Sequence, residues 1–199
     1  MTLTFRAASL ALLCAFLASC NLIRPKQRES AEGEGMPATA AVVPVNNQSQ
    51  DITMPVLIRY FLEEALDDKG FKVPIRFDEL DNRLRQLGIT EGAQVNDGNI
   101  QNIGQNLKVD GIVQGTLYEV SMNKGVKVLR ASFRLVSVFS GRTLWEKQVE
   151  IEQKVGDRLP VKGTVTSDWT LKRARSMTRS GAGKLPKKLV RDALKTLKN

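Results

Sequence analysis

The residues with distinctive chemistry in this chain are its two cysteines, Cys14 and Cys20, because the sequence contains no histidine. Without histidine there is no Ser-His or Cys-His nucleophile pair, no imidazole proton shuttle at neutral pH and no His-containing zinc site. Paired carboxylates could still perform acid–base catalysis, but no two of them are placed together outside ordinary helix and strand faces. We therefore predict a protein that is not an enzyme and that needs no cofactor, metal or small-molecule substrate.

The context of Cys20 indicates how this thiol is used. Residues 1–19 have the layout of a secretory signal peptide, in which one cation, Arg6, precedes an apolar run. That run is shorter than the roughly 20 residues needed to cross a bilayer. Residues 17–20, Leu-Ala-Ser-Cys, resemble the lipobox of bacterial lipoproteins. The resemblance implies cleavage between Ser19 and Cys20 and acylation of the Cys20 thiol, which is the only good nucleophile nearby.

The residues after Cys20 predict where the protein is held. Asn21, at the second mature position, resembles lipoproteins sorted to the outer membrane. Residues 20–37 are rich in Gly, Pro, Glu and Ser, which predicts a flexible tether with a span of about 20–25 Å. We expect the protein on the periplasmic face of the outer membrane or on the cell surface, with membrane lipid as a partner through acylated Cys20. Because the signal peptide directs the protein out of the cytoplasm, we expect no nucleic acid among its partners.

Residues 38–168 predict one α/β (α+β) domain with the element order β-α-β-α-α-β-β-β, and a helix in the basic segment 169–199 adds a final α. An apolar run at 38–45 predicts a buried first strand. Pro55 suits the first turn of a helix that Gly70 ends.

In that helix an apolar stripe would face the core, with Arg59 and Glu63 on the opposite, polar side. Residues 71–75 predict a second strand. Two further helices are expected, the first capped by Asp78 and the second by Asn96 or Asp97.

From residue 110 the hydrophobic period changes from 3.6 to 2, and this predicts three long strands. They cover residues 112–120, 126–138 and 142–155, with Gly125 and Gly141 at the hairpin turns. The strands form an antiparallel meander, and we expect the mixed sheet to pack against two or three helices.

A three-residue loop ending at Gly141 sets the register of the last hairpin. It places Trp145, Val149 and Ile151 on the apolar side of the meander, with Phe139 on that same side. On the other side it places Arg130 and Arg134 beside glutamates of the third strand. This charged ladder is either a solvated sheet face or a surface that binds a partner.

The net charge of +9 is concentrated at the C-terminus. From Lys172 to Lys198 there are ten cations and one acid, whereas residues 20–171 hold 19 cations and 20 acids. The segment contains an apolar stripe at helical spacing, with cations away from it: Lys187, Lys188, Arg191 and Lys195. This helix either packs on the sheet with a solvated basic face or contacts anionic lipid, anionic cell-wall polymer or an acidic partner.

Three segments of the chain carry a resemblance to known proteins. They are Val42-Val43-Pro44-Val45-Asn46-Asn47-Gln48-Ser49, Leu107-Lys108-Val109-Asp110-Gly111-Ile112-Val113-Gln114-Gly115 and Leu135-Val136-Ser137-Val138-Phe139-Ser140-Gly141-Arg142-Thr143-Leu144-Trp145. Together they resemble an uncharacterised family of bacterial lipoproteins known from neisserial surface-antigen candidates. More remotely, they resemble the α/β domain of the curli secretion protein CsgG, the N-terminal domain of TolB and the penicillin-binding-protein activator LpoB. The resemblance implies a non-enzymatic role through protein contacts.

Together the lipobox and this resemblance lead us to expect an outer-membrane lipoprotein that is a subunit or accessory of an envelope secretion or assembly complex. Its partner would be a CsgG-like envelope protein or further copies of itself. Two alternatives stay open. One is a regulator of a cell-wall synthase, as LpoB is, and the other is a module that binds anionic envelope polymers through the basic C-terminal segment.

Overall fold

A mixed sheet organises the part of the chain that our computed structural model describes, residues 34–154 and 183–198. The strands are β1 (Ala40–Val42), β2 (Asn46–Asn47), β3 (Gly111–Asn123), β4 (Val126–Ser137) and β5 (Thr143–Lys154). The helices are α2 (Met54–Asp68), α3 (Phe77–Gln86), the 3-10 turn η2 (Gly92–Gln94), α4 (Ile100–Leu107) and α6 (Lys184–Leu194). Within these two ranges, every helix is too short or too polar to traverse a bilayer.

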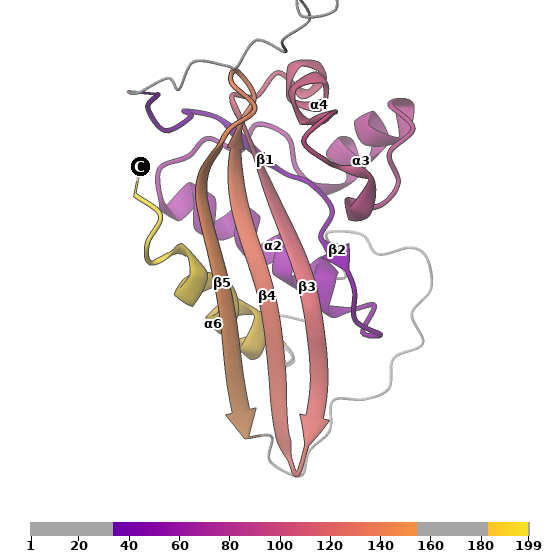
Figure 1. The fold of residues 1–199 in the computed structure, drawn as a ribbon, viewed down its shortest axis with the longest axis vertical. Coiled ribbons are helices and arrows are strands. Elements are labelled where there is room, and N and C mark those ends of the chain that lie inside the picture. The colour runs from indigo at the N-terminus through magenta and orange to yellow at the C-terminus, as the bar shows by residue number, and fades with distance from the viewer. Residues whose placement is uncertain (1–33, 155–182, 199) are drawn as a thin grey trace, which may run out of the picture. The chain divides into compact units, whose positions relative to one another are not determined.

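The strand order is β1-β3-β4-β5, and β2 also pairs with β3. Strands β1 and β2 run parallel to β3, whereas β3, β4 and β5 form an antiparallel meander (Figure 1). This confirms the predicted mixed α/β class and its C-terminal meander. Gly125 and Gly141 have φ angles of 76° and 70°, so both hairpin turns use a backbone conformation that glycine adopts without steric cost.

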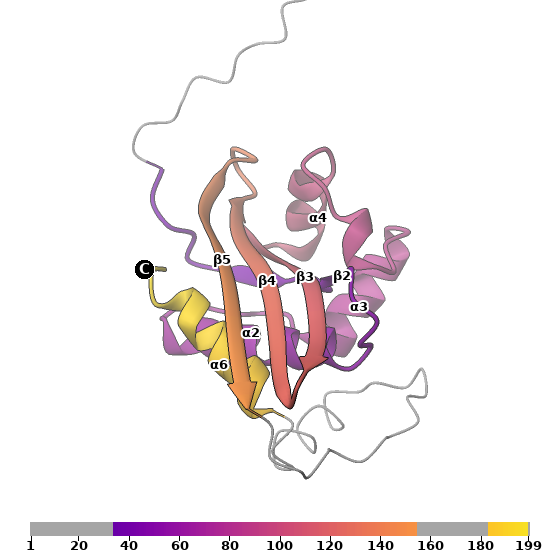
Figure 2. The ribbon, with the colours of Figure 1, turned by 60° about the horizontal axis from the view of Figure 1, so that its bottom comes forward.

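Side chains alternate between two hydrophobic cores, one on each face of the sheet. Val113 and Leu135 belong to the first core, which α2 and α6 cover, while their neighbours Ile112 and Val136 belong to the second, which α3 and α4 cover. Figure 2 shows α6 along β5, and α3 with α4 beside β3. The second core reaches only the first half of β3, so the rest of that sheet face lies outside it.

Helix α6 belongs to the first core. The apolar stripe predicted for it is buried against α2 and β5: Leu185, Leu189, Val190, Ala193, Leu194 and Leu197. Two hydrogen bonds fix its end, because Lys69 Nζ donates to the carbonyl oxygen of Leu197 at 3.0 Å and Trp145 Nε1 donates to Thr196 Oγ1 at 3.1 Å. Of the two predicted alternatives, the structure therefore has the helix packed on the sheet. Its cations lie on the outer side.

Several predicted elements differ from the structure. The apolar run 38–45 holds only the short strand β1, and the polar residues after it form β2 rather than ending the pairing. Residues 71–75 contribute a single bridge, Lys72 with Thr39, rather than a strand, because Pro74 has no N–H for a ladder. Helix α3 starts at Phe77 with Arg76 as its N-cap, so Asp78 lies within its first turn. Helix α4 is capped by Asn99, not by Asn96 or Asp97, since residues 96–99 form a turn of their own.

The prediction for Phe139 is wrong, because its side chain is 87% exposed. Strand β4 ends at Ser137, whose N–H donates to the carbonyl oxygen of Arg142. The turn is therefore longer than the predicted three residues, and a register shift after Leu135 absorbs the difference. Up to Leu135 the register is the predicted one, with Leu135 opposite Trp145 and Arg134 opposite Glu146.

Candidate functional site: a polar face on the long strands

Beyond the second core, the same face of β3, β4 and β5 carries polar side chains, and we call this region the polar sheet face. Its members are Gln114, Thr116, Tyr118, Glu119, Arg130, Ser132, Arg134, Glu146, Gln148 and Glu150. Strand alternation puts them together, because the intervening residues, such as Leu129 and Ala131, are in the first core. Most of them are exposed or half-buried.

Arg134 is held in place at the edge of the second core. Its Nε donates to Gln114 Oε1 at 2.6 Å, and its Nη2 lies 2.8 Å from Asp97 Oδ1. Gln114 is buried and donates in turn from Nε2 to the carbonyl oxygen of Val95 at 3.0 Å. The guanidinium therefore has a fixed position between the sheet and the loop before α4.

Arg130 lies further along β4 and forms a second polar group with residues of β3. Its Nη2 is 3.3 Å from Glu119 Oε2, and Ser121 Oγ donates to Glu119 Oε1 at 2.7 Å. A register irregularity between Leu117 and Glu119 aims Glu119 at Arg130. Beside it, the hydroxyls of Tyr118 and Ser132 are hydrogen-bonded at 2.9 Å.

The two arginines lie opposite glutamates of β5 as predicted, but in the part of the chain that the structure describes they do not form ion pairs with them. Arg130 lies opposite Glu150 and Arg134 opposite Glu146. Within the described residues, however, the ion pairs of both arginines go to Glu119 and Asp97 instead. As a result, Glu146 and Glu150 form an exposed acidic row on the edge strand β5.

The sequence-predicted interaction residues are divided between two separate surfaces. Arg130 and Arg134 are on the polar sheet face, whereas α6 packs on the opposite face of the sheet, with its cations exposed: Lys187, Lys188, Arg191 and Lys195. Lys195 Nζ lies 2.8 Å from Asp192 Oδ1, and Lys195 is the main cause that holds the pKa of the Asp192 carboxyl below its ordinary value. Ser19 and Cys20 lie outside the described residues.

A buried charged group joins α2, α3 and β1, where the helical pattern predicted a solvated face. Arg59 and Glu63 are only 5% and 2% exposed, because α3 covers the side of α2 predicted to be polar. Arg59 Nε donates to the carbonyl oxygen of Val42 at 3.0 Å, and its Nη1 lies 2.7 Å from Asp81 Oδ1. The guanidinium also lies 4.8 Å from the centre of the Phe77 ring.

Glu63 completes this group. Its Oε1 lies 3.9 Å from Arg59 Nε and accepts a hydrogen bond from the Phe77 N–H at 3.3 Å. Burial raises the pKa of the carboxyl from 4.5 to about 7, against the opposing attraction of Arg59. The group connects elements of the fold, with Arg59 and Glu63 buried and Asp81 38% exposed at its edge. Among the described residues no cluster of His, Cys, Asp or Glu could hold a metal ion.

The raised pKa of Glu63 predicts how stability depends on pH. Because the folded state holds this proton more tightly than the unfolded state does, the free energy of unfolding should fall as pH rises from about 4.5 to about 7. Glu63 should contribute a decrease on the order of 3 kcal/mol in the free energy of unfolding over this range. Glu63→Gln has no carboxyl to titrate at this position, so the decrease should be absent from that variant. Urea unfolding between pH 4 and 8 measures it. If the free energy of unfolding changed equally with pH in the wild-type chain and in Glu63→Gln, the prediction would be contradicted.

Comparison with known proteins agrees with the fold. No protein-family model matches this chain, and no curated protein matches its sequence. The lipoprotein GNA1162 of Neisseria meningitidis aligns over 75% of this chain and 98% of its own, at 18% identity and a TM-score of 0.55.

Two further solved structures are similar. PelC of Paraburkholderia phytofirmans, solved as a dodecamer, aligns over 79% of this chain and 84% of its own, at 14% identity and a TM-score of 0.51. The C-terminal domain of LpoB from Escherichia coli covers 61% of this chain and 88% of its own at 18% identity, but its TM-score of 0.44 supports no structural argument. This chain thus shares its α/β fold with a neisserial lipoprotein.

Proposed function

We propose that this chain is a lipid-anchored protein of the bacterial outer membrane that acts, without catalysis, as a subunit of an envelope secretion or assembly complex. The observation that carries the proposal is the polar sheet face. Its two arginines are held in position by hydrogen bonds and ion pairs, and its acidic row is exposed. Contact through prepositioned charges favours specific recognition of a protein partner.

The anchor in this proposal is Cys20, cleaved after Ser19 and acylated. Two or more acyl chains would hold the protein stably, since one chain gives only marginal binding. The similar fold of GNA1162, a protein described as a lipoprotein, is consistent with such an anchor. The asparagine that follows Cys20 supports sorting to the outer membrane and the periplasmic face.

Self-assembly is the form of contact we propose first. The acidic row, Glu146 and Glu150, and the basic side of α6 carry opposite charges and lie on opposite faces of the sheet. Surfaces of opposite sign on separate faces allow head-to-tail association of identical chains into a ring. PelC, which shares the fold, was solved as a dodecamer.

The test is cross-linking in envelopes, followed by affinity purification in mild detergent and mass identification of the bound proteins. We expect oligomers of this chain with a CsgG-like or other outer-membrane component. Cys20→Ala should abolish membrane attachment and recovery of that component. Glu150→Lys should reduce the oligomer about tenfold or more, because it sets like charges against each other. Asp68→Lys, the same charge change at an exposed position on α2, should leave the oligomer intact.

The outcomes separate the alternatives. A monomer in mild detergent with no envelope partner would contradict the proposal. Recovery of a cell-wall synthase would instead favour the regulator predicted from the LpoB resemblance.

The exposed cations of α6 favour a second candidate, a module that binds anionic envelope polymers. Loss of lipopolysaccharide or peptidoglycan binding in a Lys187→Glu, Lys188→Glu chain would support that candidate, since both side chains point outward from the buried stripe.

A further inference from the structure

The exposed ring of Phe139 is held at one end of the sheet by the turn that carries it. In this turn the Gly141 N–H donates to the carbonyl oxygen of Ser137 at 2.9 Å, and Gln101 Nε2 donates to the carbonyl oxygen of Phe139 at 2.8 Å. The backbone is therefore fixed while the side chain is 87% exposed. The turn therefore presents a large apolar side chain to the surroundings at a fixed place in the fold.

The chain enters the domain at this same end. Thr39 N and Oγ1 both donate to Asp110 Oδ2, at 3.1 and 2.7 Å, and the Gly111 N–H donates to the carbonyl oxygen of Thr39 at 2.9 Å. The carbonyl oxygen of Asp110 accepts the N–H of Val138 at 2.8 Å. A continuous run of hydrogen bonds thus joins the entry of the chain to the residue before Phe139.

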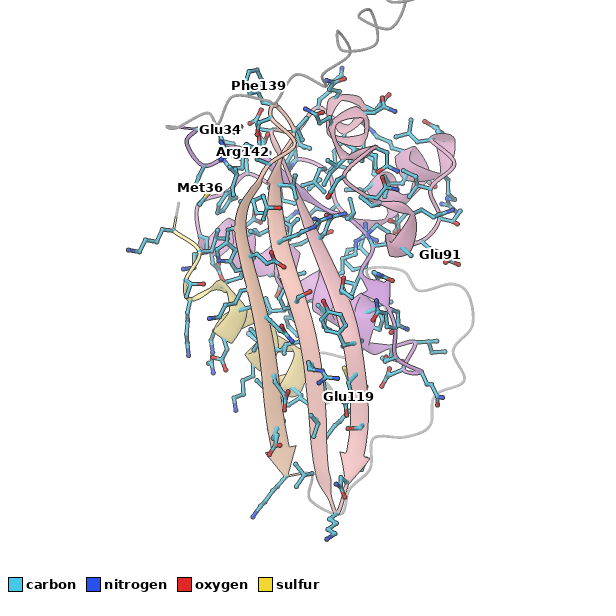
Figure 3. All side chains as sticks on the ribbon, in the orientation of Figure 1. Glu34, Met36, Glu91, Glu119, Phe139 and Arg142 are labelled. Atoms are coloured by element: carbon cyan, nitrogen blue, oxygen red, sulfur yellow. The ribbon has the colours of Figure 1, made fainter. Side chains whose placement is uncertain are left out.

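The same end of the domain carries another exposed apolar side chain, two cations and the acid Glu34, which Figure 3 labels at this end. Met36, 38% exposed, is on the entering segment, and Figure 3 shows it with Phe139 and Arg142 toward the end of the sheet that is opposite Glu119. Lys108 is exposed just before the entry point at Asp110. Phenylalanine with neighbouring Lys and Arg is the composition of segments that lie in the headgroup region of a membrane.

We propose that the Phe139 turn, with Met36, is a membrane-contact site that inserts into the headgroup and acyl boundary of the bilayer that holds the Cys20 anchor. This inference rests on the anchored lipoprotein of the proposed function and adds which end of the domain meets the lipid. The occupant is the bilayer, because the segment that follows Cys20 enters the domain at this same end.

The length of the intervening chain agrees with this orientation. From Cys20 to Met36 there are sixteen residue steps, and a coil of that length has a mean span of about 20–24 Å. Strand β3, 13 residues long, extends about 40 Å from this end to the β3–β4 turn. The anchor therefore keeps the Phe139 end closer to the bilayer than the opposite end.

A fluorescent label on Phe139→Cys tests the proposal in the full mature, acylated chain. When Cys14 has left with the signal peptide and Cys20 is acylated, the introduced thiol is the only free one. The matched control is Met122→Cys at the opposite end of β3, where the side chain is 49% exposed. Both chains carry the environment-sensitive fluorophore NBD and are reconstituted in vesicles of phosphatidylethanolamine and phosphatidylglycerol.

At position 139 we expect a blue shift on reconstitution and about twofold quenching by lipids with a doxyl group near the headgroup, since an interfacial group lies roughly 5–10 Å deep. At position 122 neither change is expected. Chains that float with the vesicles and carry acyl mass on Cys20, but whose label at 139 stays in water, overturn this inference alone.

Three other outcomes also overturn it. If the chain does not float with the vesicles, or carries no acyl mass on Cys20, then there is no lipid anchor. Both the proposed function and the membrane-contact site would then be wrong. A shift at 122 instead of 139 reverses the orientation. A shift at 139 without vesicles, growing with protein concentration, assigns the turn to a second copy of the chain. Unchanged thermal unfolding of the labelled chain shows that the fold is retained.

Discussion

Replacement of Arg59 by alanine should lower the free energy of unfolding by about 3–5 kcal/mol, because it leaves Glu63 buried without its counter-charge. The guanidinium also loses its hydrogen bond to the Val42 carbonyl, its ion pair with Asp81 and its contact with the Phe77 ring. Three elements would lose a shared connection at once. Urea denaturation of the mature chain at pH 7.5, followed by circular dichroism, measures the change.

Two controls distinguish the buried group from an ordinary ion pair. Arg83 pairs with Glu79 at 2.8 Å, and both are exposed, so Arg83→Ala should cost only about 0.3–0.5 kcal/mol. The double change Arg59→Met with Glu63→Leu removes both charges and should recover most of the loss. In Arg59→Ala the pKa of Glu63 should rise further, because the attraction of Arg59 opposes the effect of burial. Equal effects of Arg59→Ala and Arg83→Ala would refute the buried connection.

Leu189→Ala should destabilise the domain by about 2–5 kcal/mol, since the side chain is completely buried in the first core and its truncation leaves a cavity. The measurement is urea unfolding of the chain with Cys20→Ser, which would prevent the proposed acylation. The neighbouring Lys188 is exposed on the same helix, so Lys188→Ala should change stability by less than about 0.5 kcal/mol.

The comparison of these two neighbours decides whether α6 is part of the fold in solution. A large effect at Leu189 with a small one at Lys188 supports packing against α2 and β5. Equal small effects would mean that the helix contributes nothing to the core, and would favour the alternative in which the segment is held by an external anionic partner.

The local sequence predicted the meander well, because its register depends on a few adjacent residues. Period-2 alternation and Gly141 were sufficient to pair Arg134 with Glu146 and Leu135 with Trp145. The same reasoning failed at Phe139, where the register shift after Leu135 lengthens the turn. The alternation of apolar and polar residues before a bulge is the same as without it, so this pattern could not predict the register shift.

The polar sheet face was predicted only in part, since ion pairs depend on residues distant in sequence. Alternation placed Arg130 and Arg134 on one face, but their partners come from β3 and from the loop before α4. Similarly, the burial of Arg59 and Glu63 results from α3 packing across α2. Helical periodicity identifies one buried face, and a second covering element is not visible in it.

The place of α6 in the first core has a consequence for when the protein can fold. Leu194 and Leu197 pack with residues of α2 that precede them by more than a hundred positions. Such distant contacts make folding slow relative to that of proteins built from local contacts. The first core cannot close before Leu194 and Leu197 are available. A chain emerging from the ribosome would thereby be kept from closing this core until Leu194 and Leu197 have been synthesised.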